Sequence, residues 1–151
     1  MLGNLNVFLA APLFNDSERK FNKRLASRLR LSGFNVWMAQ EAPFIKHGSP
    51  EEKKRIFESD LEALRKSSVV VAVLDGKDVD SGSAFEIGYA YALSKPIIGL
   101  KTDYRTFSRM EEVNLMLEVP LVRLCRSVEE VIDALELIQK KGRSAKRPSL
   151  G

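Results

Sequence analysis

The sequence predicts a three-layer α/β/α fold built on a five-stranded parallel sheet. Short apolar segments alternate with longer amphipathic segments along almost the whole chain. The apolar segments show little of the polar alternation that is typical of strands with one face in water, so helices should cover both faces of the sheet. Strands and helices that alternate in this way form parallel sheets, because a crossover helix joins each strand to the next. The 151 residues suffice for one such domain.

Five short apolar segments are the expected strands. The strongest signal is at residues 68–74, where β-branched side chains follow one another almost without interruption. Such a continuous run is typical of a central strand that is buried on both faces. The other expected strands are residues 6–11, 35–38, 96–100 and 121–124.

Helix signals occupy the segments between these strands. Leu25 and Leu29 follow Phe21 at intervals of four residues, which places all three on one helix face. Ser49 precedes a proline and, three residues later, Glu52, which is a capping pattern at the start of a helix. The expected helices are residues 16–32, 49–66, 84–93, 110–117 and 127–141.

The number and alternation of the strands suit the flavodoxin-like order 2-1-3-4-5. In sheets of this kind, ligands bind in the crevice outside the carboxyl ends of strands 1 and 3, where the strand order reverses. We therefore expect the loops after Leu9 and after Leu74 to line the functional site.

Composition restricts the chemistry that the chain can perform. One cysteine, Cys125, and one histidine, His47, exclude an internal disulfide framework and argue against zinc sites and histidine-based triads. No apolar run approaches the ~18 residues of a membrane span, and the first residues lack the basic region of a signal peptide. We therefore expect a soluble cytoplasmic protein without a membrane anchor, a metal or another cofactor, whose chemistry depends on carboxylates.

The net charge of +4 originates at the end of the chain. Residues 140–151 hold five basic residues and no acidic one, and the rest of the chain has 19 basic and 20 acidic residues. We therefore expect a domain at residues 1–141 and a basic, disordered tail at residues 142–151. No aromatic residue interleaves the charges of the tail, so no specific nucleic-acid binding is expected.

The loop after the third expected strand carries the most informative group of residues. Asp80 precedes the small residues Ser81, Gly82 and Ser83, whose backbone amides open the next helix and form a natural anion cradle. Glu86 follows about one helical turn later, with small neighbours that leave open space above its carboxylate.

Two further helix residues depart from an ordinary pattern. Asp60 shares a helix face with Ile56 and Leu64, where a carboxylate is costly unless it is bonded or used. Gly88 lies inside a helix, where glycine costs roughly 1 kcal/mol relative to alanine, so we expect close packing or a ligand beside it. Without a function, Asp60 would be an ion-paired edge residue and Glu86 a solvated surface residue.

Three carboxylates around one crevice indicate glycosyl transfer. When their environments differ, one carboxylate attacks an oxocarbenium-like anomeric carbon and another handles the proton of the leaving group. Asp60, Asp80 and Glu86 are the candidates for these roles. The scarcity of histidine and cysteine fits a reaction of this type.

Four segments also occur in an order that a known family shares. Residues 80–90 contain Asp, Gly, Glu, Gly and Ala at the spacing D-x-G-x-x-x-E-x-G-x-A. Residues 7–14 form an apolar strand and loop, residues 60–61 are Asp-Leu, and residues 114–116 are Asn-Leu-Met. Together they resemble the nucleoside 2-deoxyribosyltransferase family, which includes the 2′-deoxynucleoside 5′-phosphate N-hydrolases. The resemblance covers most of residues 6–118.

The resemblance implies a role for each matching residue. Glu86 would be the nucleophile that forms a glycosyl ester at C1′, and Asp60 and Asp80 would contact the base, one of them moving a proton. Asn114 would reach the sugar in a neighbouring subunit's site, so the protein would be a homo-oligomer. The implied substrates are a nucleoside or nucleotide and a free nucleobase. The implied substrate-binding residues are Phe8, Ala10, Pro12, Gln40, Ser81, Gly82, Ser83, Asn114 and Met116.

Phe8 departs from the family pattern, because many members carry a tyrosine there whose hydroxyl bonds the nucleophilic carboxylate. Phenylalanine also suits the core, so the simplest interpretation is a buried aromatic residue. Loss of the hydroxyl would leave space beside Glu86, which leads to the hypothesis that ribonucleosides or ribonucleotides are accepted. The test compares kcat/KM for deoxycytidine and cytidine in the wild type and in Phe8→Tyr, and an unchanged ratio rejects the hypothesis.

Three functions stay open at the level of the sequence. The first is transfer of a deoxyribosyl group to another nucleobase through a covalent intermediate on Glu86. The second is hydrolysis of a nucleoside 5′-monophosphate, whose phosphate Arg19, Lys20, Arg105 or Arg109 would bind. The third is a non-catalytic nucleotide-binding module on the same fold. The Asn-Leu-Met segment favours the transferase, and a binding module has no need of three costly carboxylates.

Overall fold

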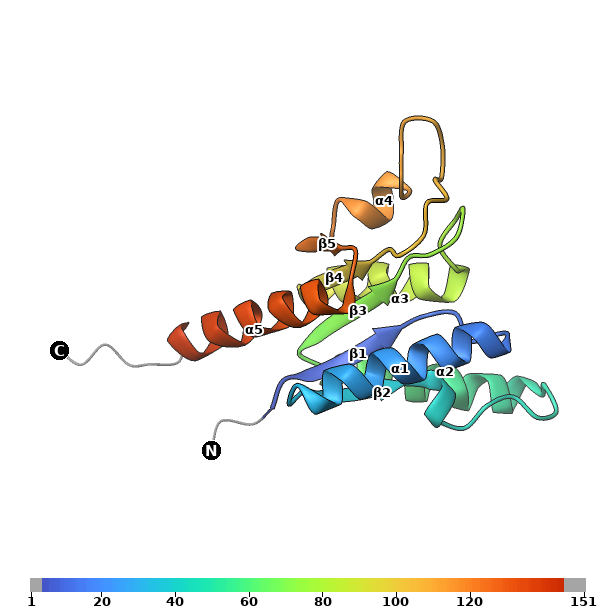
Figure 1. Ribbon diagram of the computed structural model, residues 1–151. Coiled ribbons are helices and arrows are strands. Elements are labelled where there is room, and N and C mark those ends of the chain that lie inside the picture. Colours follow the sequence, from blue (N-terminus) through green and yellow to red (C-terminus); the bar gives the residue numbers. More distant parts are fainter. Residues whose placement is uncertain (1–3, 146–151) are drawn as a thin grey trace.

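In the computed structural model, which describes residues 4–145, a parallel sheet lies between two layers of helices (Figure 1). The five strands are arranged in the order β2-β1-β3-β4-β5, and every neighbouring pair is parallel, which confirms the predicted topology. The strands are β1 (Asn6–Ala10), β2 (Asn35–Met38), β3 (Val69–Val73), β4 (Ile97–Leu100) and β5 (Arg123–Cys125).

Capping side chains determine where the first two long helices begin. Asn15 Oδ1 accepts the N–H of Glu18 at 2.9 Å and Glu18 Oε2 accepts the N–H of Asn15 at 3.2 Å, so α1 has a complete capping box. Ser49 Oγ accepts the N–H of Glu52 at 3.1 Å and caps α2, as the sequence predicts. The helical elements are α1 (Asp16–Leu31), the 3₁₀ turn η1 (Ala39–Glu41), α2 (Pro50–Lys66), α3 (Ser81–Ala92), α4 (Leu115–Glu118) and α5 (Val128–Ala145).

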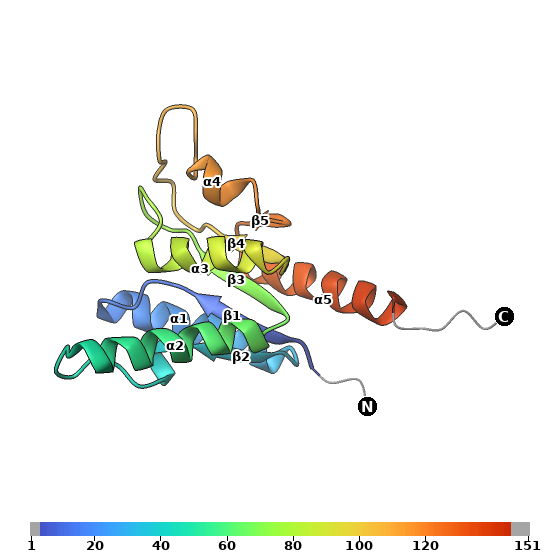
Figure 2. The same cartoon turned by 180° about the vertical axis from the view of Figure 1, so that it is seen from behind.

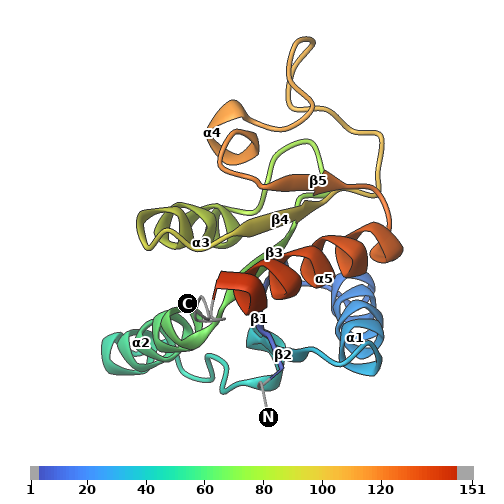
Figure 3. The same cartoon turned by 90° about the vertical axis from the view of Figure 1, so that its left-hand side faces the viewer.

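The helices divide into two layers, one on each face of the sheet. Helices α1 and α5 lie on one face, and α2 and α3 lie on the other (Figures 2 and 3). Strand β1 alternates between the two cores, with Val7 and Leu9 in the first and Phe8 and Ala10 in the second. All residues of β3 are buried, as expected of a central strand.

The carboxyl ends of β1 and β3 lie side by side in the middle of the sheet. Leu9 pairs with Val71 and Ala10 with Ala72, so the chain leaves both strands at the same edge. The connection from β1 leads to α1 on one face, and the connection from β3 leads to α3 on the other. This is the reversal at which open α/β sheets bind ligands, so the fold places the expected site here.

Helix α4 differs from its prediction, because it begins at Leu115 rather than at residue 110. Asn114 Oδ1 accepts the N–H of Met116 at 3.0 Å and caps the helix at this later point. Upstream, Ser108 Oγ accepts the N–H of Glu111 at 3.0 Å. These side-chain bonds support turns in place of the expected first helical turns.

Strand β5 is Arg123–Cys125 rather than residues 121–124. The N–H of Leu121 bonds back to the carbonyl of Glu118 at 3.0 Å, so this residue closes a turn and does not pair in the sheet. The sequence pattern contains an apolar run across both the turn and the strand, which explains the early start of the prediction.

Helix α5 continues past its expected end at residue 141 and reaches Ala145. Residues 141–144, near the end of this helix, are exposed. The remainder of the expected basic tail, residues 146–151, lies outside the described residues. Within residues 4–145, no helix has both the length and the apolar character needed to cross a membrane.

Candidate active site

Asp80 lies where the loop from β3 enters α3. Its Oδ2 accepts the N–H of Ser83 at 3.0 Å and the Ser83 hydroxyl at 3.3 Å, so Asp80 is the N-cap of the helix. A helix does open at the predicted small-residue turn. The Asp80 carboxylate itself takes up the amide of Ser83, which fixes the position of this side chain.

Glu86 lies about one turn further along α3 and lines the same cavity as Asp80. Burial is the main cause that raises the pKa of Glu86 from 4.5 to about 8, and the charges of Asp60 and Asp80 contribute further. A strongly perturbed carboxyl group in a cavity, with specific charged neighbours, is typical of a functional site.

Asp60 approaches from the neighbouring helix, α2, which packs against α3. Asp60 is half-buried, and burial raises the pKa of its carboxyl group. The structure therefore brings the three predicted carboxylates together from three segments: α2, the β3–α3 loop and α3. Residues 4–145 contain no group of three or more His, Cys, Asp or Glu side chains arranged to hold a metal ion.

The cavity that these carboxylates share has a volume of about 130 Å³. It lies at the reversal of strand order, and the ends of β1 and β2 supply much of its lining. As expected, the loop after Leu9 lines this cavity, through Ala11, Leu13 and Phe14, whereas Ala39 was not predicted. The position of Ala39 directly after β2, the strand next to β1, is the signal that could have identified it. The lining residues are Leu9, Ala11, Leu13, Phe14, Ala39, Asp60, Asp80, Gly82, Ser83 and Glu86.

Two predicted substrate-binding residues, Gly82 and Ser83, line this cavity, whereas Ser81 is exposed outside it. Phe8 and Ala10 are buried in the core below the site. Phe8 is 1% exposed and stacks on Trp37 with ring centroids 4.8 Å apart. The simple interpretation of Phe8 as a core aromatic thus describes this chain, and its effect on sugar selectivity stays a prediction.

Gln40 and Pro12 support the wall of the site and do not line the cavity. Gln40 Nε2 donates to the carbonyl of Arg19 at 3.0 Å, and Gln40 Oε1 accepts from Asn22 Nδ2 at 3.0 Å. The same amide of Asn22 donates to the carbonyl of Pro12 at 2.9 Å. These bonds fasten the segments after β1 and β2 to α1.

Asn114 and Met116 also lie outside this cavity. Asn114 caps α4 and borders the β3–α3 loop. Met116 is 72% exposed. This placement is what a role in a neighbouring subunit's site requires, and that role stays a prediction.

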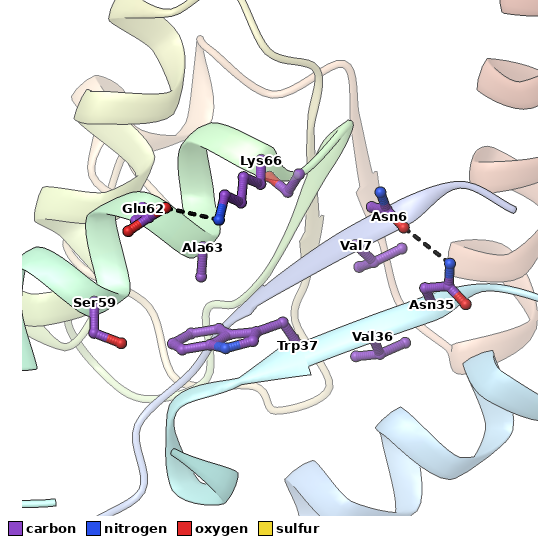
Figure 4. A pocket seen from close by; sticks show the side chains of 10 residues that line it. Asn6, Val7, Asn35, Val36, Trp37, Ser59, Glu62, Ala63 and Lys66 are labelled. Atoms are coloured by element: carbon purple, nitrogen blue, oxygen red, sulfur yellow. Dashed lines mark hydrogen bonds and ion pairs between the residues drawn. The ribbon is translucent and has the colours of Figure 1, made fainter. Parts of the chain in front are cut away.

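A larger groove of about 460 Å³ lies between α2 and the strands β1 and β2 (Figure 4). Asn6 and Asn35, at the amino ends of their strands, are hydrogen-bonded at 2.9 Å on one side of it, and Trp37 lies on its floor. The Lys66–Glu62 ion pair, at 2.7 Å, lies on the opposite side. None of the predicted site residues lines this groove, so the carboxylate cavity is the candidate active site.

Comparisons with known proteins identify the family to which the chain belongs. A family model described as nucleoside 2-deoxyribosyltransferase matches residues 7–131. A nucleoside deoxyribosyltransferase of Limosilactobacillus fermentum is 28% identical over 128 residues, which cover 77% of this chain and 76% of the relative. A 2-deoxyribosyltransferase structure from Bacillus psychrosaccharolyticus has a TM-score of 0.74 at 26% identity, over 85% of this chain and 90% of that chain. A Clostridium botulinum CMP N-glycosidase shares the fold, with a TM-score of 0.53 at 23% identity, over 88% and 98%.

The parallel sheet, the carboxylate cavity and the family match together define an enzyme of the α/β class. The chain belongs to the nucleoside 2-deoxyribosyltransferase family, because the family model covers most of its length. The resemblance seen in the sequence is thereby confirmed.

Proposed function

We propose that this enzyme is a nucleoside 2-deoxyribosyltransferase, which cleaves an N-glycosidic bond and transfers the deoxyribosyl group to another nucleobase. The observation that supports this most strongly is the position of Glu86, enclosed in a cavity between two further carboxylates. The substrates are then a nucleoside and a free nucleobase, and the reaction needs no cofactor. We also propose a cytoplasmic location, because the single cysteine, Cys125, is a buried free thiol.

Glu86 is the nucleophile in this proposal. Its carboxylate attacks C1′ of the bound nucleoside as the N-glycosidic bond breaks, and the bonding electron pair leaves with the base. The product of this step is a glycosyl ester on Glu86, which the nitrogen of a second base then attacks to re-form an N-glycoside. Both steps pass through an oxocarbenium-like sugar, which neighbouring carboxylates stabilise.

The leaving base needs a proton, and Asp60 is the better candidate to supply it. Burial raises the pKa of Asp60, which favours the protonated form of that carboxyl group. Asp80 accepts two hydrogen bonds from Ser83, which hold its carboxylate in place to bind a base N–H. Asp60 would recover its proton from the incoming base in the second step.

A second copy of the chain completes the site in this proposal. The cavity of about 130 Å³ is small for a nucleoside and a second base. Around Asn114, the neighbouring Leu115 and Met116 are 54% and 72% exposed, which is unusual for apolar side chains unless another surface covers them. We infer that this segment covers the cavity of a neighbouring subunit and brings Asn114 to its sugar.

The cavity favours a nucleoside over a nucleoside 5′-monophosphate. Its lining in the described chain contains three carboxyl groups and no lysine or arginine, so no cationic side chain there would balance the charge of a phosphate. Arg19, one candidate for a phosphate ligand, is already bonded to Asp16 and to the carbonyl of Leu13. Arg105, another candidate, pairs with Asp103 at 2.6 Å.

Product analysis decides between transfer and hydrolysis. Purified enzyme is incubated with deoxyinosine, with and without adenine or cytosine, beside a Glu86→Gln control of almost equal size. A new nucleoside that forms only with added base, and is lost in the control, is the expected result. Free hypoxanthine without a new nucleoside would instead identify a hydrolase, and nucleoside monophosphates would then be compared as substrates.

A further inference from the structure

Lys101, directly after β4, is one of the most deeply buried side chains of the protein, with 1% of its surface exposed. An ammonium group that is enclosed in this way must replace its lost hydration by bonds to the protein. Nζ of Lys101 donates to Asp103 Oδ1 at 2.7 Å, to the carbonyl of Gly76 at 3.1 Å and to that of Leu74 at 3.5 Å. The lysine therefore joins the end of β4 to the start of the β3–α3 loop.

A second set of bonds joins the same two segments. The carboxylate of Asp75 accepts the N–H of Thr102 at 2.6 Å, the Thr102 hydroxyl at 2.6 Å and the N–H of Asp103 at 3.2 Å. Asp103 Oδ2 accepts the N–H of Gly76 at 2.9 Å. We call this group, residues 75–76 and 101–103, the Lys101 clasp.

The segment that the clasp holds leads directly into the active site. Gly76, at φ +113°, turns the chain at the clasp in a conformation that side-chain-bearing residues rarely adopt. Three residues later Val79 is buried in the core, and Asp80 follows as the N-cap of α3 and a wall of the cavity. A displacement of Gly76 is therefore passed to Asp80 over a short length of chain.

We propose that Lys101 is a positioning residue for the active site. By holding the carbonyls of Leu74 and Gly76, it fixes the β3–α3 loop and keeps Asp80 against Ser83 and Glu86. Lys101 does not line the cavity, so it acts on the reaction only through the loop. The proposal rests on the proposed function and deepens it, because a residue outside the site would keep one of the active-site carboxylates, that of Asp80, in its position.

Lys95 provides a matched control. Its Nζ also donates to two backbone carbonyls, those of Arg65 at 2.9 Å and Ser67 at 2.5 Å, and it lies just before β4 where Lys101 lies just after it. Lys95 thus joins segments at the amino ends of β3 and β4, whereas the cavity lies at the carboxyl ends of the strands. Lys101→Met and Lys95→Met each remove an ammonium group that donates to two backbone carbonyls, and only Lys101 also pairs with a carboxylate.

The first measurement is hydrogen exchange at the N–H of Ser83, which reports on its bond to Asp80 and needs no enzymatic activity. The second is the titration of the Glu86 carboxyl carbon by NMR. In Lys101→Met we expect exchange at Ser83 to be about tenfold faster and Glu86 to titrate at lower pH, because the charge of Asp80 has moved away. With deoxyinosine, kcat should fall about tenfold with little change in KM. Lys95→Met should match the wild type in all three readouts.

Equal exchange at Ser83 and equal titration of Glu86 in the two variants would overturn the proposal, whatever the thermal stability of each. If Lys101→Met does not fold, Thr102→Val replaces it, because that variant removes only the exposed hydroxyl bond to Asp75. Thr102→Val should change both readouts in the same direction by a smaller amount. An unchanged rate of hydrogen exchange at Ser83 would again reject the proposal. If the wild type proves inactive, the proposed function fails while exchange and titration still decide the role of Lys101.

Discussion

Glu86 has to meet two requirements that oppose each other. As a nucleophile it must lose its proton, yet burial, with Asp60 and Asp80 as further causes, raises its pKa to about 8. At pH 7 roughly a tenth of the free enzyme therefore carries an ionised Glu86. The reactive form is the minor one, and the same burial that makes it scarce keeps water from a glycosyl ester once it forms.

The first prediction follows from this pKa. With deoxyinosine as substrate, kcat/KM should fall about tenfold per pH unit above about pH 8. The reactive free enzyme has Glu86 ionised and Asp60 protonated, and this pair of carboxyl groups loses its one proton as the pH passes the pKa of Glu86. A pH series of initial rates measures it. Asp80→Asn, which removes one of the charges that raise this pKa, should shift the fall to lower pH. A kcat/KM that stays constant well above pH 8 would contradict the assignment of Glu86.

The second prediction concerns stability, and its sign follows from the same residue. In the unfolded chain Glu86 titrates near 4.5 and in the folded chain near 8, so the folded state holds the extra proton between these values. The contribution of Glu86 to stability is therefore fully present below pH 4.5 and is lost as the pH rises to 8. Glu86→Gln, which cannot ionise, should be about 4–5 kcal/mol more stable than the wild type at pH 9.

Urea unfolding of both proteins at pH 4.5 and pH 9 measures this difference. At pH 4.5 the two free energies of unfolding should be nearly equal, since the wild-type carboxyl group is then protonated in the folded state. A difference that is the same at both pH values would show that the substitution acts through packing and not through the charge of Glu86.

At the scale of elements, Gly88 in α3 and Gly99 in β4 differ in the space that surrounds them. Close packing or a ligand was expected beside Gly88, but a Cβ added there meets nothing within 4 Å in this single chain, so no packing reason is present. On β4, a Cβ added at Gly99 would lie 2.7 Å from Cδ1 of Leu121 and 2.7 Å from Cδ1 of Leu74. The close approach of side chains to the sheet therefore requires glycine at position 99 and not at position 88.

The third prediction tests this contrast. Gly88→Ala should stabilise the protein by about 0.5–1 kcal/mol, because alanine favours the helix and no clash opposes it. Gly99→Ala should destabilise it by about 1–2 kcal/mol, because the buried Leu74 and the partly buried Leu121 must move. Chemical denaturation of the two variants is the measurement. If Gly88→Ala destabilises instead, a contact on α3 that a single chain lacks is the reason to examine next.

The sheet and its long helices were predictable because their signals are local. The continuous β-branched run at 68–74 identifies β3, and the Ser49 capping pattern identifies the start of α2 within a residue. The order of strands followed from alternation and general topology rules. The weak predictions, α4 and β5, concern segments whose ends are set by bonds of Ser108, Asn114 and the Leu121 turn.

The candidate site was predictable in its carboxylates and less so in its surroundings. Asp60 was identified by its apolar helix face, and Asp80 and Glu86 by the small residues around them, and all three line one cavity. Gln40 was expected to bind substrate but supports the wall of the cavity, and the neighbouring Ala39 lines the cavity instead. The sequence could not decide between them, because which residue faces a cavity depends on how distant segments pack. Lys101 is the extreme case, since a single lysine after a strand is ordinarily solvent-exposed.

At the scale of the whole molecule, the segment between β4 and β5 extends away from the sheet (Figure 3). It exposes several apolar side chains, with Tyr104, Met110 and Val119 at 100%, 92% and 78%. A protein of this size gains little from such a projection unless another surface covers it. The second copy that we propose as partner provides that surface, and Asn114 lies in the same segment.

The last prediction tests this arrangement by subunit complementation. Glu86→Gln and Asn114→Ala should each be inactive or nearly so, because every site in either protein lacks one of the two groups. When the two variants are mixed under conditions that exchange subunits, a mixed pair contains one site with both Glu86 and a neighbour's Asn114. In an equal mixture of dimers about a quarter of the wild-type activity should therefore return.

A matched mixture separates this result from a general effect of exchange. Asp60 and Glu86 line one cavity within a single chain, so Asp60→Asn mixed with Glu86→Gln leaves every site short of one carboxylate and should recover no activity. Recovery in the first mixture and not in the second is the signature of a site that two chains build. If neither mixture recovers activity although exchange is complete, Asn114 acts within its own chain, and the exposed face around Met116 must have another purpose.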